Sequence, residues 1–238
     1  DLHSFPTRRS SDLYGYLSID LGLHNLMTCY DSAGTSFILG RKYLEISQKY
    51  DKEIARLGHQ WNSCQSAGGI KYPKPSKHML KIYKKKRNCI HDYLHKVTRA
   101  VVNYCKANDI HTVIIGDITN IRRNKNLGKV TNQKLHALPY AKIYGMLEYK
   151  LAMQGITLAK QTEEYSSQCS PHAPQVTKEY AKKCNRTSRG LYKDQLSVYN
   201  ADAVGAYNIM RKYFAGCGKE KKISVTGLSS PMIIKVAV

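Results

Sequence analysis

Residues 14–40, YGYLSIDLGLHNLMTCYDSAGTSFILG, decide the fold that the sequence predicts. Apolar and β-branched runs at residues 14–23, 25–34 and 35–40 are separated by short polar or glycine-containing turns. Consecutive short strands joined by tight turns are typical of an antiparallel meander. The first strand ends in Asp20, so the sequence predicts a carboxylate at the edge of a sheet.

Helices and strands alternate after the meander. Residues 41–58 are expected to be helical and residues 59–75 to form a loop, because the latter contain Gly-Gly and two prolines. Ser76 is a candidate N-cap for a long helix whose apolar residues recur every three or four positions. Further strands are expected at 110–117 and 156–165, and further helices at 138–155 and 200–214. The order β-β-β-α-β-α-β-α predicts an α/β, ribonuclease H-like mixed sheet flanked by helices.

The two ends of the chain need separate interpretation. Residues 1–13, DLHSFPTRRSSDL, match one reading frame of a common sequencing adapter, and we interpret them as a disordered translated artefact; a disordered natural tail is the alternative. We therefore expect the natural protein to continue upstream of Tyr14. The last segment, PMIIKVAV, is expected to be a short strand or a docking segment.

The charge of the chain indicates a polyanionic partner. Its 38 basic and 17 acidic residues give a formal net charge of +21. An excess of this size is most often found in proteins that bind nucleic acid. The basic residues cluster at 77–87, 120–129 and 178–193, with tyrosines among them that offer rings for base stacking.

Cysteine usage and hydropathy place the protein in a reducing compartment. Seven cysteines at irregular spacing, without an apolar signal segment, are typical of reduced thiols in a cytoplasmic protein. No apolar run is long enough to predict a transmembrane helix. We expect a cytoplasmic protein.

Two carboxylates are candidates for chemistry. Asp20 closes the first strand and Asp202 opens the last helix. Each also has an ordinary structural interpretation, because Asp20 suits a turn, and Asn200 or Asp202 suits a helix N-cap. In a ribonuclease H-like fold the first strand and the last helix converge. Acids there hold two divalent ions for phosphodiester hydrolysis, and oxygen ligands favour Mg²⁺ or Mn²⁺.

Four motifs carry a specific resemblance: SIDLGLHNLMT, VIIGDITNIR, EEYSSQCS and YNADAVGAYNIMRKY. Between Tyr14 and Phe214 the chain resembles the nuclease region of the TnpB family of insertion-sequence proteins, historically described as transposases and related to type V CRISPR effectors. The resemblance implies an RNA-guided DNA endonuclease with a RuvC-like site. Its partners would be DNA and a guide RNA, with no membrane, and its acids would fall on Asp20 and Asp202.

The resemblance also implies a domain organisation. A RuvC-like nuclease domain would span residues 14–214, with a helical insert at 41–108 and a degenerate zinc-ribbon-like loop at 165–199. Residues 215–238 would form a C-terminal tail, and the family's recognition domains would lie upstream of this fragment.

The family's middle glutamate is missing, because its position at the end of strand 110–117 holds Gly116. Asp117 is one residue late, which normally turns a side chain to the opposite face of a sheet. Glu163 and Glu164 close the neighbouring strand, and of these two at most one fits. We favour Glu164, because it directly precedes the segment that matches the family's Tyr-Thr-Ser motif. Glu163 and Asp117 are weaker candidates.

The zinc ribbon of the family is degenerate. Cys169 is present, His172 stands where a second cysteine belongs, and Cys184 has no partner two residues on. A closed structural zinc site needs four ligands. We therefore predict a loop without zinc, held by packing or by nucleic acid.

The candidate nucleic-acid contacts come from the three basic clusters: Lys84, Lys85, Lys86, Arg87, Arg122, Arg123, Lys125, Arg186 and Arg189. Three functions stay open. The first is a divalent-metal DNA endonuclease guided by RNA. The second is an inactive RNA-guided DNA-binding protein, and the third is a DDE-type transposase with the same fold and metals.

Overall fold

The computed structural model describes residues 15–118, 138–188, 190–218 and 223–237. In this part of the chain, six strands form a mixed sheet in the order β5-β4-β1-β2-β3-β8. The strands are β1 (Gly15–Leu21), β2 (Met27–Asp31), β3 (Ser36–Leu39), β4 (Ile110–Asp117), β5 (Thr157–Thr162) and β8 (Met232–Ile233). The predicted meander is confirmed, because β1, β2 and β3 pair antiparallel in sequence order.

The centre of the sheet is parallel. Strand β4 pairs parallel with β1 on one side and with β5 on the other. Ile19 is opposite Ile115, and Gly116 is opposite Gln161. Asp20 therefore lies next to Gly116 in the sheet, and the ends of β1, β4 and β5 meet at one edge.

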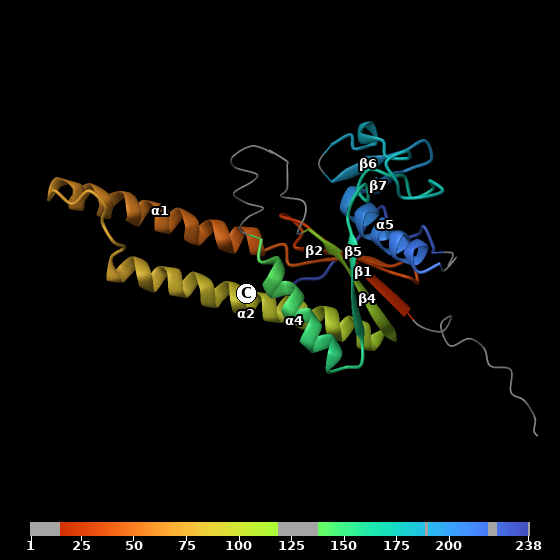
Figure 1. Cartoon of the computed structure of the whole chain (residues 1–238), viewed down its shortest axis with the longest axis horizontal. Coiled ribbons are helices and arrows are strands. Elements are labelled where there is room, and N and C mark those ends of the chain that lie inside the picture. Colours follow the sequence, from red (N-terminus) through yellow and green to blue (C-terminus); the bar gives the residue numbers. More distant parts are fainter. Residues whose placement is uncertain (1–14, 119–137, 189, 219–222, 238) are drawn as a thin grey trace, which may run out of the picture.

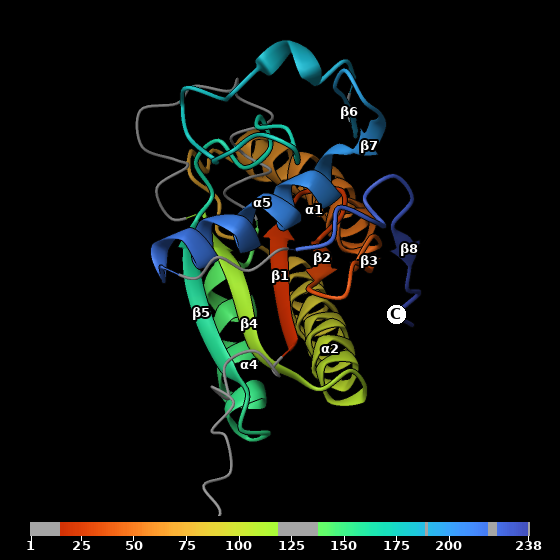
Figure 2. The same ribbon diagram turned by 90° about the vertical axis from the view of Figure 1, so that its right-hand side faces the viewer.

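Helices cover both faces of the sheet (Figure 2). On one face Leu17, Ile19 and Val113 belong to a core shared with α2 (Lys77–Ala107) and α4 (Tyr140–Ala152). On the other face Tyr16 and Ile114 pack with α5 (Ala201–Gly216). Because side chains alternate along a strand, Asp20 and Gly116 both lie on the α5 face.

A long helical hairpin projects from the sheet (Figure 1). It consists of α1 (Tyr43–Ala67) and α2, and the side chain of Ser76 caps α2 by accepting from the Met79 N–H at 3.2 Å. The prediction of a loop at 59–75 is wrong for its first half, because α1 continues to Ala67. The indole N–H of Trp61 donates to the carbonyl of Lys74 at 2.8 Å and ties the end of α1 to the turn before α2.

The remaining described segments are the ribbon-like loop and the C-terminal strand. Strands β6 (Leu191–Lys193) and β7 (Val198–Asn200) form a separate two-stranded sheet within the predicted ribbon-like loop, which also holds the short 3₁₀ helix η2 (Lys183–Asn185). Of the two alternatives for the C-terminal segment, the structure shows the strand: β8 pairs parallel with β3. Residues 1–13 and most of the expected loop at 118–137 lie outside the described residues. None of the described helices is long and apolar enough to cross a membrane.

Burial on α2 predicts different costs for the same substitution. Leu94 is fully buried, whereas Leu80 is 55% exposed. Leu94→Ala should lower the free energy of unfolding by about 2–5 kcal/mol through lost transfer energy and a cavity. Leu80→Ala on the same helix should change it by no more than about 0.5 kcal/mol. Urea denaturation measures both, and equal costs would show that α2 does not pack on the sheet as described.

Candidate functional site at the edge of the sheet

Asp20 is held tightly at the end of β1. A Cβ built on Gly205 of α5 would contact its carboxylate, with the Asp20 Cγ only 3.2 Å away, so α5 can pass this close only because residue 205 is glycine. Burial raises the pKa of Asp20 well above its usual value, and the carboxylates of Glu163 and Asp202 raise it further. Asp20 therefore lies within electrostatic reach of two other acids.

Glu163 occupies the space that Gly116 leaves empty. A Cβ built on Gly116 would overlap the Glu163 side chain, whose Cγ and Cδ would both lie 2.6 Å from it. The Glu163 side chain extends from the end of β5 over β4 because the chain turns sharply after residue 163. In this turn Tyr165 has φ 62°, and the Ser166 N–H and hydroxyl both donate to the Glu163 carbonyl. The structure thus places a carboxylate where a side chain at position 116 would lie.

The Glu163 carboxylate has too few partners for its charge. Burial raises its pKa to about 8, the neighbouring Asp117 adds to the rise, and a hydrogen bond from the backbone of Leu21 opposes it. Its Oε1 atom is buried and has no hydrogen-bond partner among the described residues. A buried carboxylate oxygen without a donor is costly, and a cation would relieve that cost.

This geometry favours Glu163 over Glu164, which was the choice made from the sequence. Glu164 is exposed, and its backbone carbonyl accepts from Lys212 at 3.0 Å, whereas Glu163 is the residue beside Asp20. Asp117 lies near Tyr140 of α4, whose pKa its charge raises, and Tyr140 belongs to the core on the face opposite α5. Asp117 is therefore a neighbour of the site from the other side of the sheet.

Asp202 lies in the first turn of α5. The N-cap is Asn200, whose side chain accepts from the N–H groups of Asp202 and Ala203 at 3.1 and 3.0 Å. This leaves the Asp202 carboxylate available for other contacts, and the Asn25 amide donates to it at 2.8 Å. Asn25, which follows β1, was not identified from the sequence, because a lone asparagine in a turn carries no signal of its own.

Arg186 is the cation nearest to these carboxylates for which an ion pair is described. Its Nη2 lies 3.9 Å from Asp202 Oδ1, and its charge lowers the pKa of Asp20. The side chains of Arg186 and Asp202 are 38% and 32% exposed, so the ion pair is partly screened by water. Arg186 therefore offsets only part of the negative charge at this edge.

No group of three or more His, Cys, Asp or Glu side chains within the described ranges is placed closely enough to hold a metal ion. Asp20, Glu163 and Asp202 influence one another electrostatically but do not form a closed cage. Their carboxylate oxygens are nevertheless the ligand type that Mg²⁺ and Mn²⁺ prefer.

The zinc-ribbon remnants each have another partner. The Cys169 thiol is buried and donates to the Thr177 carbonyl at 3.3 Å, and His172 Nε2 lies 2.9 Å from the Tyr199 hydroxyl. Cys184 is exposed, with its sulfur 3.7 Å from the Asn185 side chain. The structure does not bring the three together, and these residues do not fit a zinc site.

Helix α5 fastens the ribbon-like loop instead. Asn208 is fully buried, and its amide donates to the carbonyls of Ser166 and Cys169 at 2.7 and 2.9 Å. Arg211 donates to the carbonyls of Ser170, Ala173 and Pro174. Neither residue was identified from the sequence, because their partners are backbone atoms that no side-chain motif reveals.

The predicted nucleic-acid contacts divide into three groups. Lys84, Lys85 and Arg87 are exposed on α2. Lys86 is mostly buried and pairs with Asp51 of α1 at 2.6 Å, so it joins the two helices of the hairpin. Arg122, Arg123, Lys125 and Arg189 lie outside the described residues.

Two family models and a curated relative match this chain. A family model described as "Probable transposase", OrfB_IS605, matches residues 14–122, and a model of the Cas12f1-like TNB domain matches residues 140–209. The putative RNA-guided DNA endonuclease InsQ of Escherichia coli (strain K12) is 26% identical over 91% of this chain. The chain covers 53% of InsQ, or about half the length of this curated relative.

Solved structures share the fold. A Cas12f1–sgRNA–target DNA complex matches 81% of this chain and 48% of its own, with a TM-score of 0.59 and 16% identity. A CRISPR-Cas12f ternary complex matches 81% of this chain and 38% of its own, with a TM-score of 0.57 and 16% identity. The family models and InsQ support an insertion-sequence protein of the transposase-related class. More narrowly, the same matches show that the chain is similar to proteins of the TnpB family.

The contacts of Asn208 predict a stability effect. Asn208→Ala leaves two carbonyls inside the protein without their donor and should lower the free energy of unfolding by about 2–4 kcal/mol. Asn103→Ala, on the exposed face of α2, is the matched control and should change it by less than about 0.5 kcal/mol. Denaturant unfolding measures both, and limited proteolysis should cleave first within residues 165–199 of the Asn208 variant. Equal stability of the two variants would contradict the fastening role.

Proposed function

We propose that this chain is the ribonuclease H-like, RuvC-type nuclease part of an RNA-guided DNA endonuclease. Its catalytic carboxylates are Asp20, Glu163 and Asp202, and its partners are DNA and a guide RNA. Similarity to the TnpB family and the name of the relative InsQ support this activity. The net charge of +21 supports a polyanionic partner.

One observation carries the proposal. The Glu163 carboxylate lies in the empty side-chain space of Gly116, beside Asp20, with one oxygen buried and unpartnered among the described residues. An ordinary structural glutamate would be expected to have donors for both oxygens. A buried carboxylate oxygen that lacks a donor and lies beside another carboxylate is typical of a cation site.

The donor set fits divalent cations in chemical type. Asp20, Glu163 and Asp202 would hold Mg²⁺ or Mn²⁺, but they lie farther apart here than ion binding requires and must draw closer together. When bound, two such ions supply an activated water and stabilise the leaving oxygen in phosphodiester hydrolysis. Other residues of the chain position the carboxylates. Gly205 allows α5 to approach Asp20, and Asn25 orients Asp202.

Binding without cleavage is the second candidate function. It is favoured by the absence of a closed three-acid cage in the described ranges and by the pairing of Arg186 with Asp202. In that case the carboxylates would only shape a nucleic-acid surface. Substitution of the acids separates the two functions.

The acids should differ sharply in their effect on cleavage. In the full-length protein loaded with its guide RNA and Mg²⁺, Asp20→Ala and Glu163→Gln should each reduce DNA cleavage by more than about 100-fold, equivalent to about 2.7 kcal/mol of activation free energy. Glu164→Gln, the adjacent exposed control, should retain wild-type cleavage. Glu163→Gln should be at least as stable as wild type at neutral pH, because the fold disfavours the ionised form of Glu163 that the unfolded chain carries. Loss of cleavage in Glu164→Gln alone would overturn the assignment.

Exchange of the carboxylate between strands tests its position directly. Gly116→Ala should reduce cleavage, because its Cβ displaces Glu163. Glu163→Ala should also be inactive, but Gly116→Glu combined with Glu163→Ala returns a carboxylate to the same space and should regain at least a tenth of wild-type cleavage. All variants are compared by single-turnover cleavage. A double variant as inactive as Glu163→Ala would show that Glu163 acts in some other way.

A further inference from the structure

The helical hairpin holds a basic hollow away from the carboxylates. Between α1 and α2 lies a cavity of about 330 Å³ lined by Lys49, Lys52, Arg56 and Lys85. Glu53 is the acid in its lining, and Tyr50 and Ile82 are its apolar walls. Residues 49–56 lie six to thirteen positions into α1, roughly 9–20 Å along the helix from its start beside the sheet.

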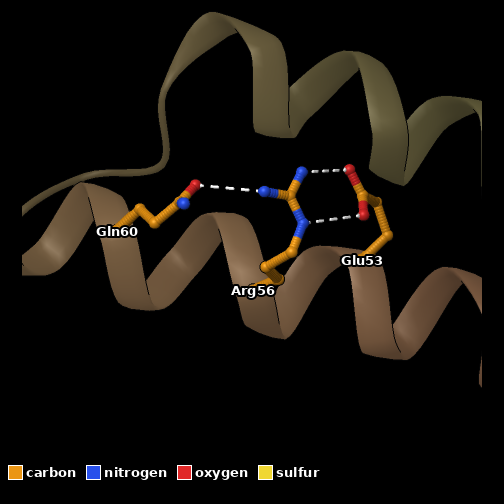
Figure 3. Close-up of polar contacts among 3 residues, drawn as sticks. All are labelled: Glu53, Arg56 and Gln60. Carbon is orange, nitrogen blue, oxygen red and sulfur yellow. Dashed lines mark hydrogen bonds and ion pairs between the residues drawn. The ribbon is translucent and has the colours of Figure 1, made fainter.

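The one acid in the lining is already engaged. Glu53 accepts two hydrogen bonds from Arg56, from Nε at 3.1 Å and from Nη2 at 2.8 Å. Nη1 of Arg56 donates to Gln60 at 3.3 Å, so the guanidinium lies along α1 between its two partners (Figure 3). Arg56 is therefore fixed in place, and Glu53 has little capacity left to neutralise the lysines.

The three lysines of the hollow have no ion pair among the described residues. Nearby Lys86 shows the contrast, because it pairs with Asp51. Lys49, Lys52 and Lys85 are all exposed, and no acidic partner is described for any of them. Three like charges gathered around one hollow repel one another unless an anion lies between them.

We propose that this hollow binds phosphate groups in the backbone of a nucleic-acid strand. Lysine ammonium groups neutralise phosphate as point charges, and the fixed Arg56 adds a directed cation. An exposed ring favours a strand over a free anion: Tyr83, which follows Ile82 of the lining on α2, is 45% exposed. Such rings stack on bases. The inference rests on the proposed function, since it gives the RNA-guided enzyme a second contact outside its carboxylate site.

Salt-dependent binding tests the hollow with a charge-matched control. The test variant is Lys49→Gln, Lys52→Gln and Lys85→Gln together. The control is Lys106→Gln, Lys142→Gln and Lys235→Gln, which removes equal charge from exposed positions outside the hollow and outside the three basic clusters. Oligo(U) and oligo(dT) of equal length are titrated by fluorescence anisotropy in EDTA, and log Kd is plotted against log salt concentration.

The hollow variant should bind about tenfold more weakly near physiological salt, and its slope should fall by about 2, since each lost single-strand phosphate contact removes about 0.7. The control should change the slope by less than about 0.5. Loss with both oligonucleotides supports a contact to backbone shared by RNA and DNA, and loss with one identifies which strand the hollow holds. An unchanged slope, or an equal fall in the control, would overturn the proposal.

The outcome is independent of catalysis, because binding is measured without metal. Wild-type binding by the hollow variant, together with inactive Asp20→Ala, would reject the hollow and leave the nuclease proposal intact. Weakened binding by the hollow variant, together with cleavage by Asp20→Ala, would support the hollow and reject the nuclease proposal. Circular dichroism of both triple variants should match wild type, because none of the six lysines is buried.

Discussion

The parallel register between β1 and β4 is the constraint on which the site depends. With Ile19 opposite Ile115, Asp20 and Gly116 become neighbours on the face covered by α5. Two glycines then allow what larger residues would prevent: Gly205 lets the helix approach Asp20, and Gly116 leaves room for Glu163. A slip of β4 by one residue would turn Gly116 to the α2 face and put another side chain into the space that Glu163 occupies.

Negative charge at this edge is only partly compensated by the chain itself. Desolvation and repulsion by neighbouring carboxylates raise the pKa values of Asp20 and Glu163. The partners that oppose this rise are a backbone N–H at Leu21, Lys212 and the half-exposed Arg186. The packed core on both faces of the sheet holds the carboxylates together despite their repulsion. Binding of the proposed cation would relieve this electrostatic cost.

Much of the fold follows from the sequence, because periodicity and capping residues act locally. The meander, the cap at Ser76 and the strand beside Gly116 were all predictable in this way. The choice between Glu163 and Glu164 was not, since alternation fails where Tyr165 adopts a left-handed conformation that no residue type there signals. The extension of α1 to Ala67 was likewise hidden, because the contact from Trp61 to Lys74 becomes visible only when the two helices lie together.

Gly116 and Glu163 also have a consequence for how this family diverges. Because any Cβ at position 116 overlaps the Glu163 side chain, the two positions exclude each other as carriers of an inward carboxylate. A lineage that moved the acid from one strand to the next had to change both sites. Relatives should therefore show covariation: an acid at the position of Gly116 with a small residue at that of Glu163, or glycine with glutamate, and seldom an acid at both.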